Sequence, residues 1–295
     1  MTKTGHNRKK RKKTKIQNRP EQQALFELPN SFSSFADLAQ FASSSVYIIA
    51  RIRQEGESTR ITTLGTGFLA GEHRMVTCDH VMNSEGSEHH DDDIYLLAQR
   101  NHPEWHRSFV RLKSGEDLFL NPENDSAILY LPDSFYYDES GNMIKDPKIH
   151  LRLSRAPSRL ASDVGVLGYP MQQLLFQDDG SDVNIETMIL RADKGVVNAT
   201  YKDSNDITMT EFTMGFNPGN SGGPILDIMT GNVIAIVHGY QSLPIRAKVE
   251  HIPLDMIDGG TKDEDVVSVV RALYSLGVSS VNLLGYENSH GLSFK

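Results

Sequence analysis

The chain of 295 residues has one cysteine, one tryptophan and no long apolar run. With Cys78 alone, no intramolecular disulfide can form, which excludes a disulfide-stapled secreted scaffold and permits a reducing compartment. No segment reaches the roughly 18 consecutive apolar residues of a membrane-spanning helix, so the sequence predicts no membrane span. The rest of the composition, 38% hydrophobic and 23% charged, is that of an ordinary soluble globular protein.

Acidic side chains are absent from the first 20 residues. Lysine and arginine supply nine positive charges there, and because the whole chain carries −8, the remainder carries −17. Residues 1–23 have too few apolar side chains to offset the entropy of ordering, so we expect a disordered basic arm. Residues 1–20 could bind nucleic acid or another anionic surface, act as an import-like signal, or serve only as a solvated tail. The sequence leaves these alternatives open.

An apolar stretch is also missing after the basic start. A secretory signal places 7–15 apolar residues there, whereas residues 17–23 are polar. The pattern therefore predicts no export by this route and a cytoplasmic location.

The body of the chain has the pattern of an all-β protein. Residues 31–43 space Phe35, Leu38 and Phe41 three apart and predict one short lead-in helix. From Val46 onward, short β-rich runs alternate with turn residues, which is typical of a sandwich or barrel. The valine-rich residues 263–276 are predicted to form a closing amphipathic helix. The expected organisation is a disordered arm (1–23), an N-terminal β-barrel with its lead-in helix (31–135), a linker (136–147), a C-terminal β-barrel (148–257), and a C-terminal helix and tail (258–295).

Ser221 lies in the turn 217–224, among three glycines, two asparagines and two prolines. This composition suits a rigid irregular turn that presents the hydroxyl beside backbone N–H groups. A lone Gly-x-Ser-x-Gly is more often an ordinary glycine-rich loop, but Gly-Asn-Ser-Gly-Gly-Pro is more specific. Such a serine requires a histidine and an acid earlier in the chain.

Two residues meet that requirement. Among eleven histidines, His80 lies where an apolar strand ends, and Asp125 immediately precedes an apolar strand. An imidazole can take the serine proton near neutral pH, and a carboxylate can orient the imidazole. The N–H groups of Gly219 and Ser221 are the candidate donors of an oxyanion hole.

Two other groups are candidates for metal binding or nucleophilic chemistry. The run from His89 to Asp93 resembles a metal-ligand cluster, but adjacent residues on a charged loop do not readily converge on one ion. A solvated loop is therefore favoured, and we predict no metal site. Cys78 is predicted to be a packed strand residue and not a second nucleophile.

The order His80, Asp125, Ser221 and the motifs around them resemble the chymotrypsin-fold (trypsin-like) serine peptidases. Within that group the chain is most similar to the HtrA-type proteases. The resemblance implies two six-stranded antiparallel β-barrels with the triad between them, and no cofactor. HtrA-type enzymes usually carry a PDZ domain after the peptidase, and the 38 residues after 257 are too few for one. The matching segments are 65–68, 76–81, 125–129, 163–170, 194–197, 217–224, 233–236 and 252–254.

The resemblance also indicates a substrate pocket lined by Gly215, Phe216, Val237 and His238. No acid occurs from Phe212 to Asn220, which disfavours a preference for lysine or arginine. Phe216 and Val237 suggest a medium apolar side chain. His238 could favour an acidic one, although a histidine that anchors the strand or pocket wall is the favoured alternative.

The sequence therefore predicts a serine endopeptidase that acts on proteins or peptides through an acyl-enzyme, as an intracellular effector or regulatory protease. The alternative is a catalytically idle peptidase fold whose basic arm docks on nucleic acid or a protein partner. The natural substrate and the oligomeric state stay open.

Overall fold

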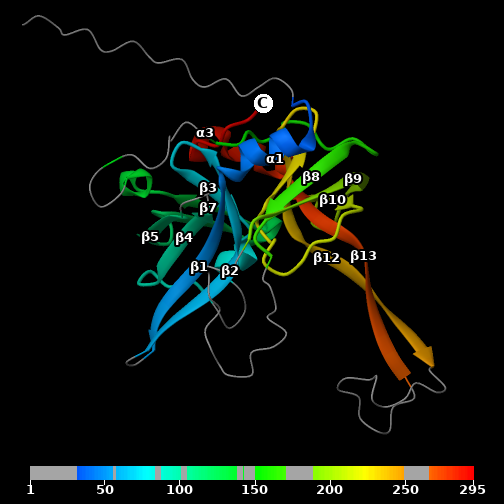
Figure 1. Cartoon of the computed structure of the whole chain (residues 1–295), viewed down its shortest axis with the longest axis horizontal. Helices are drawn as coiled ribbons and strands as arrows, with labels where there is room; N and C mark the ends of the chain where they lie inside the picture. Colours follow the sequence, from blue (N-terminus) through cyan, green and yellow to red (C-terminus); the bar gives the residue numbers. More distant parts are fainter. Residues whose placement is uncertain are drawn as a thin grey trace, which may run out of the picture.

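The computed structural model describes residues 32–55, 58–83, 88–100, 105–137, 142, 150–170, 189–248 and 266–295. The predicted basic arm and most of the predicted linker lie outside these residues. Within them the protein is mostly β, and two β-structures lie side by side with short helices at both ends of the chain (Figure 1). The predicted all-β class is confirmed. No helix of the described part is long and apolar enough to cross a bilayer.

The predicted lead-in helix is present as α1 (Phe35–Ser43). Ser34 caps it by accepting a hydrogen bond from the N–H of Asp37 at 3.2 Å. Leu38 and Ala42 on its inner face are buried. Phe35 packs so closely on Gly165 that a Cβ at this glycine would lie 2.0 Å from its ring, so α1 is seated directly on the second β-structure.

The first β-structure is an antiparallel sheet of seven strands in the order β5-β4-β1-β2-β3-β7-β6. Six strands closed into a barrel were predicted here, whereas no ladder joins the edge strands β5 and β6 in the described residues. The sheet is curled but open. Its strands are β1 (Val46–Glu55), β2 (Ser58–Gly71), β3 (Arg74–Thr77), β4 (Ile94–Arg100), β5 (Trp105–Arg111), β6 (Leu118–Asn121) and β7 (Ser126–Tyr130). Its short helices are α2 (Asp79–Met82), η1 (Pro122–Asn124) and η2 (Asp133–Tyr136).

The second β-structure is the predicted six-stranded barrel, closed in the order β10-β13-β12-β11-β8-β9. Beyond the barrel wall, β12 and β13 continue as a two-stranded ribbon that extends away from the body (Figure 1). The strands are β8 (Asp163–Gly168), β9 (Arg191–Lys202), β10 (Thr208–Phe212), β11 (Pro224–Asp227), β12 (Val233–Lys248) and β13 (Val266–Ser279).

The predicted helix over residues 263–276 is wrong, because Val266–Ser279 is strand β13. Its β-branched valines favour a strand. Strand β12 also supplies a pairing partner along its whole length, from Lys248↔Val266 to Ala235↔Ser279. Tertiary pairing thus overrides the helix-like spacing, and the barrel closes through a segment outside its predicted bounds. The helical turns follow later, as η5 (Ser280–Tyr286) and α3 (Glu287–His290).

Residues 280–295 leave the barrel and return to the first sheet, where α3 lies near β3 (Figure 1). Arg74 Nε donates to the carbonyl of His290 at 2.8 Å, and the N–H of Ser293 donates to Ala70 at 2.7 Å. Gly71 permits this approach, since a Cβ there would lie 2.4 Å from the carbonyl oxygen of Gly291. The segment is therefore part of the first β-structure as well as of the second.

Two groups of buried side chains form the core. The larger one fills the first sheet and continues into the second β-structure through Leu226, Val233 and Ile236. The smaller one lies inside the barrel and includes Phe212 and Ile225. The shared larger core fixes the two β-structures against each other, and the candidate site lies at their junction.

Candidate active site

His80 is held at the end of β3 by an abrupt change of backbone direction. The strand ends at Thr77, Cys78 keeps extended angles (φ −82°, ψ 151°), and α2 begins at Asp79. The side chain of His80 is 41% exposed. The strand end therefore presents an accessible imidazole on a rigid support, as the sequence predicted.

Asp125 occupies the residue between η1 and β7. Its backbone is left-handed, with φ 47° and ψ 49°, a conformation that aspartate tolerates better than most residues. Strands β3 and β7 pair with Thr77 opposite Ala127. This register places Asp125 next to the segment that carries His80, although 45 residues separate them in the sequence.

The two side chains form a tight pair. The N–H of His80 donates to Asp125 Oδ1 at 3.0 Å, and His80 Nδ1 lies 2.9 Å from Oδ1 and 2.8 Å from Oδ2. Burial would raise the pKa of Asp125, but hydrogen bonds from His238 and His80 outweigh it and hold that pKa well below its usual range. An ionised carboxylate only accepts, so His80 Nδ1 carries the proton and Nε2 is left as a base.

The turn around Ser221 is shaped by two glycines with positive φ, Gly219 at 92° and Gly222 at 84°. The N–H of Gly222 donates to Val237, while those of Asn220 and Gly223 donate within the turn. The N–H groups of Gly219 and Ser221 donate none of the hydrogen bonds found in the described part of the chain. The turn therefore leaves free the two donors that the sequence assigned to an oxyanion hole.

The same turn is attached to the first sheet. The N–H of Thr66 donates to the carbonyl of Ser221 at 2.9 Å, and Thr66 Oγ1 donates to the carbonyl of Gly219 at 2.7 Å. A Cβ at Gly222 would lie 2.0 Å from Thr77 Oγ1, so only glycine fits there. The structure thus seats the turn of Ser221 against β2 and β3, close to the segment that carries His80. Among the described residues, no hydrogen bond joins the Ser221 hydroxyl to His80.

His238 belongs to the same cluster, although the sequence placed it in a substrate pocket. Its Nδ1 lies 2.5 Å from Asp125 Oδ2, and its side chain is 39% exposed. Along β12 the preceding Val237 packs inside the barrel, and the pairing of β12 with β13 is interrupted between Val237 and Gly239, so His238 lies in a bulge and contacts Asp125. Neither the bulge nor the partner of His238 could be read from the sequence. The favoured alternative, an anchoring histidine, agrees with this contact.

The other predicted pocket residues are distributed differently. Phe216 is 7% exposed and Val237 is 1% exposed, and both pack in the barrel core. At Gly215, a Cβ would have no described atom within 4 Å. Of the four residues, Gly215 therefore borders open space among the described residues, whereas the side chains of Phe216 and Val237 are buried in the barrel core.

Cys78 is fully buried, as expected for a packed residue. Burial raises the pKa of its thiol, and the nearby charge of Asp125 raises it further. The protonated thiol donates to the carbonyl of Val237 at 3.1 Å. Its sulfur lies within 4.8 Å of potential ligand atoms of His80 and Asp125, but metals bind the thiolate and not the thiol.

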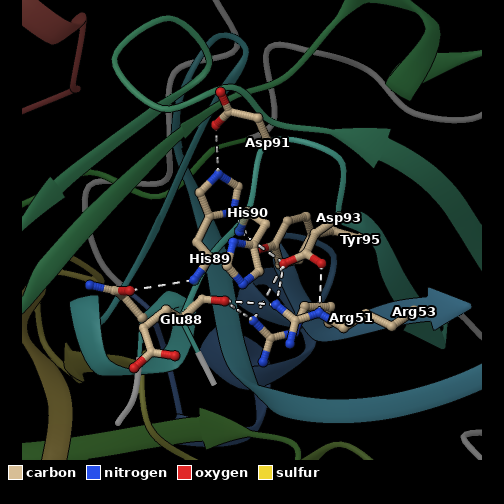
Figure 2. Close-up of polar contacts among 9 residues, drawn as sticks. Arg51, Arg53, Glu88, His89, His90, Asp91, Asp93 and Tyr95 are labelled. Carbon is tan, nitrogen blue, oxygen red and sulfur yellow. Dashed lines mark hydrogen bonds and ion pairs between the residues drawn. The ribbon is translucent and has the colours of Figure 1, made fainter. Parts of the chain in front are cut away.

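The cluster from His89 to Asp93 differs from the predicted solvated loop (Figure 2). Asp91 is exposed, but the side chains of His89 and Asp93 are only 2% and 4% exposed. Asp93 accepts two hydrogen bonds from Arg53, at 2.7 and 2.8 Å, and His89 Nδ1 contacts the hydroxyl of Tyr95 at 2.6 Å. Arg51 and Arg53 on β1 neutralise Asp93, which makes its burial possible. Tyr95 on β4 satisfies one nitrogen of His89, whereas the buried Nε2 has no hydrogen-bond partner among the described residues. The cluster fastens the loop after α2 to the sheet.

Comparisons with known proteins agree on one fold. A family model described as a trypsin-like peptidase domain matches residues 65–236. No curated protein matches the chain in sequence. Among solved structures, the chain is similar to the HtrA-type protease AlgW with a tripeptide, at 17% identity and a TM-score of 0.51, over 88% of this chain and 65% of that one. It is also similar to the active form of a protease from M. tuberculosis, at 16% identity and a TM-score of 0.51, over 94% of this chain and 95% of that one.

Proposed function

The chain belongs to the trypsin-like peptidase family, and from this premise we propose that it is a serine endopeptidase acting through an acyl-enzyme. One observation carries the proposal: Asp125 holds Nδ1 of His80 at 2.8 Å, which leaves Nε2 as a base at the junction where the Ser221 turn is seated. Ser221, His80 and Asp125 are the proposed nucleophile, base and orienting acid.

The proposed reaction follows from these roles. His80 Nε2 takes the hydroxyl proton as Ser221 Oγ attacks the peptide carbonyl, and Asp125 stabilises the imidazolium that forms. The carbonyl oxygen becomes negative and accepts from the N–H groups of Gly219 and Ser221, which donate no other hydrogen bond among the described residues. One such donor typically contributes about 2.7–4 kcal/mol in the transition state. His80 then gives its proton to the leaving amine, and water releases the acyl group by the same route.

The missing hydrogen bond between Ser221 and His80 is compatible with this role. Catalytic hydrogen bonds are often long in a free enzyme and shorten when substrate binds. We propose that the substrate side chain enters beside Gly215, in front of Phe216 and Val237, which favours a medium apolar group over lysine or arginine. Protein or peptide substrates and a role as an intracellular effector belong to the same proposal.

Labelling with a fluorophosphonate probe tests the nucleophile, and a peptide library tests turnover and side-chain preference together. We expect the wild type to be labelled at Ser221 and to cleave, and Ser221→Ala to lose both properties. Ser204→Ala is the matched control, because Ser204 is an exposed serine in the turn between β9 and β10. If the wild type is neither labelled nor active, the chain is an idle peptidase fold that serves binding.

A further inference from the structure

Asp125 is contacted by two imidazoles and not by one. His80 reaches it from α2 and His238 from β12, and both Nδ1 atoms approach Oδ2, at 2.8 and 2.5 Å. The two rings lie 5.8 Å apart and nearly perpendicular, at 85°. Because an ionised carboxylate only accepts hydrogen bonds, both rings carry a proton on Nδ1.

The position of His238 is fixed by the residue before it. The carbonyl of Val237 accepts from the N–H of Gly222 at 2.9 Å and from Cys78 Sγ at 3.1 Å. The N–H of Val237 donates to the carbonyl of Gly223 at 2.9 Å. The backbone that aims His238 at Asp125 is thus the backbone that holds the Ser221 turn, so the orientation of the acid and the position of the nucleophile are linked through β12.

We propose that His238 is a positioning residue for the triad, which locks the carboxylate of Asp125 through a second imidazole N–H and adds a further ionisation to the pH dependence of catalysis. This inference rests on the proposed peptidase function. It assigns His238 to the acid of the site and not to the recognition of an acidic substrate side chain.

The effect of pH follows from the charges around Asp125. When His80 takes the serine proton, the carboxylate stabilises the new imidazolium. A protonated His238 shares that negative charge, so less of it is available to stabilise the imidazolium while His238 is charged. The ionisable groups next to this pair are Cys78 and Asp79, which precede His80. The buried thiol is neutral at working pH, so we expect the added ionisation to belong to His238.

The hydrogen bond between His238 and Asp125 decides in which direction the pKa of His238 shifts, and so how activity depends on pH. Bonding to Asp125 raises the pKa of His238 above its ordinary value of about 6.5, although burial opposes this shift. Activity should therefore increase as His238 loses its proton, at a higher pH than an unperturbed imidazole would lose it. On the acidic side of its pH profile, kcat/KM should therefore fall as two groups of the enzyme bind a proton, and not one.

Two substitutions separate positioning from titration. His238→Asn keeps an N–H donor attached at the γ position but cannot titrate, so we expect kcat to stay near the wild-type value and the acidic side to fall with one proton. His238→Ala removes the donor, and we expect kcat to fall about 10- to 100-fold with little change in KM, the loss typical of a hydrogen bond to a charged group. His73→Asn is the control, because His73 is also half-buried and contacts a backbone carbonyl through Nδ1, at 3.1 Å. It should leave the profile unchanged.

A second measurement does not depend on turnover. In Ser221→Ala protein labelled with ¹⁵N-histidine, we expect NMR to show that titration of His238 shifts the resonances of His80, and that His238→Asn abolishes this coupling. If the coupling is present while the wild type is inactive, the peptidase function fails and the positioning role stands. If active enzyme shows no coupling and both His238 variants keep the wild-type kcat and pH profile, the inference is wrong. A change in KM alone would also overturn it, in favour of a pocket wall.

Discussion

The two β-structures carry different halves of the site and are stabilised in different ways. The barrel closes through its own ladders, and its described ion pairs are exposed, such as Asp163–Lys194 with side chains 55% and 53% exposed. The first sheet is open and depends on side-chain contacts that span it, including the buried Asp93 with Arg51 and Arg53. Its β2–β3 turn is also covered by residues 280–295.

This difference teaches how each half achieves rigidity. The barrel holds Ser221 and His238 mainly by backbone hydrogen bonds, since Val237 is bonded on both sides to the turn. The sheet places His80 and Asp125 through the β3–β7 ladder, but its loops depend on side chains, such as the Asn121 cap of η1 and the ion pairs of Asp93. Substitutions of single side chains should therefore damage the sheet more than the barrel, and the following predictions test this.

The largest effect is expected for Asp125→Asn. The amide cannot accept N–H bonds from His80 and His238 as the carboxylate does, so His80 loses its tautomer and its orientation. We expect kcat to fall by about 10⁴-fold, as for comparable triads. Stopped-time assays on a cleaved peptide measure the loss. Slower fluorophosphonate labelling of Ser221, with an unchanged circular dichroism spectrum, would show that the loss comes from the His80–Asp125 pair of the first sheet and not from unfolding. A loss below tenfold would contradict the assigned acid.

The next largest effect is expected for Asp93→Asn, because this substitution leaves two arginines beside a neutral amide. Removal of one partner of a buried ion pair typically costs about 3–5 kcal/mol of unfolding free energy. The matched variant in the barrel, Asp163→Asn, should cost about 0–1 kcal/mol because that pair is exposed. Urea unfolding of both variants provides the comparison, and equal losses would remove the distinction between the two halves.

The pH dependence of Asp93→Asn gives a further check. Burial would raise the pKa of Asp93, but hydrogen bonds from Arg53 and the N–H of His90 outweigh it and lower that pKa. A lowered pKa stabilises the fold above the unfolded value of about 3.9 and loses this contribution as the pH falls through the folded value. The stability gap between wild type and variant should therefore narrow in acid. A gap that widens in acid would contradict the ion pair.

Gly222→Ala tests the contact between the turn and the sheet. Its φ is +84°, and the new Cβ would lie 2.0 Å from Thr77 Oγ1 and 2.2 Å from the carbonyl oxygen of Thr66. Backbone strain and overlap together should cost about 2–4 kcal/mol and displace Ser221 from His80. Gly115→Ala is the control, since Gly115 has φ +76° but no atom within 4 Å of its Cβ. Thermal unfolding and kcat should both separate the two variants, and similar losses would mean that strain alone acts.

The smallest effect is expected for Cys78→Ser. The hydroxyl keeps a donor for the carbonyl of Val237, so we expect a stability loss of about 1 kcal/mol or less and a change in kcat within about threefold. Cys78→Ala, which removes the donor, should lose more stability. Melting temperatures and turnover measure both. Abolished activity in Cys78→Ser would contradict the packing role and indicate chemistry at the thiol.

The pairing of His80 with Asp125 could be predicted from the sequence, because His80 lies where one apolar strand ends and Asp125 immediately precedes another. Strand β13 could not be predicted, because its valines fit a helical spacing. Only the pairing with β12 decides between helix and strand. The burial of His89 and Asp93 was missed for a similar reason, since Arg53 and Tyr95 come from neighbouring strands. The family resemblance placed His238 in a pocket, and its contact with Asp125 could not be predicted because 113 positions separate the two residues in the sequence.

The return of residues 280–295 to β3 has a consequence during synthesis. The ribosome makes the strands of the first sheet early. Arg74 can donate its hydrogen bond to the carbonyl of His290 only after roughly two hundred more residues have been added. At about 5–20 residues per second, this takes on the order of 10–40 s. Throughout that interval the sheet that carries His80 and Asp125 lacks its cover, and the Ser221 turn joins it late. The first sheet must therefore hold its fold without this contact until residues 280–295 have been made.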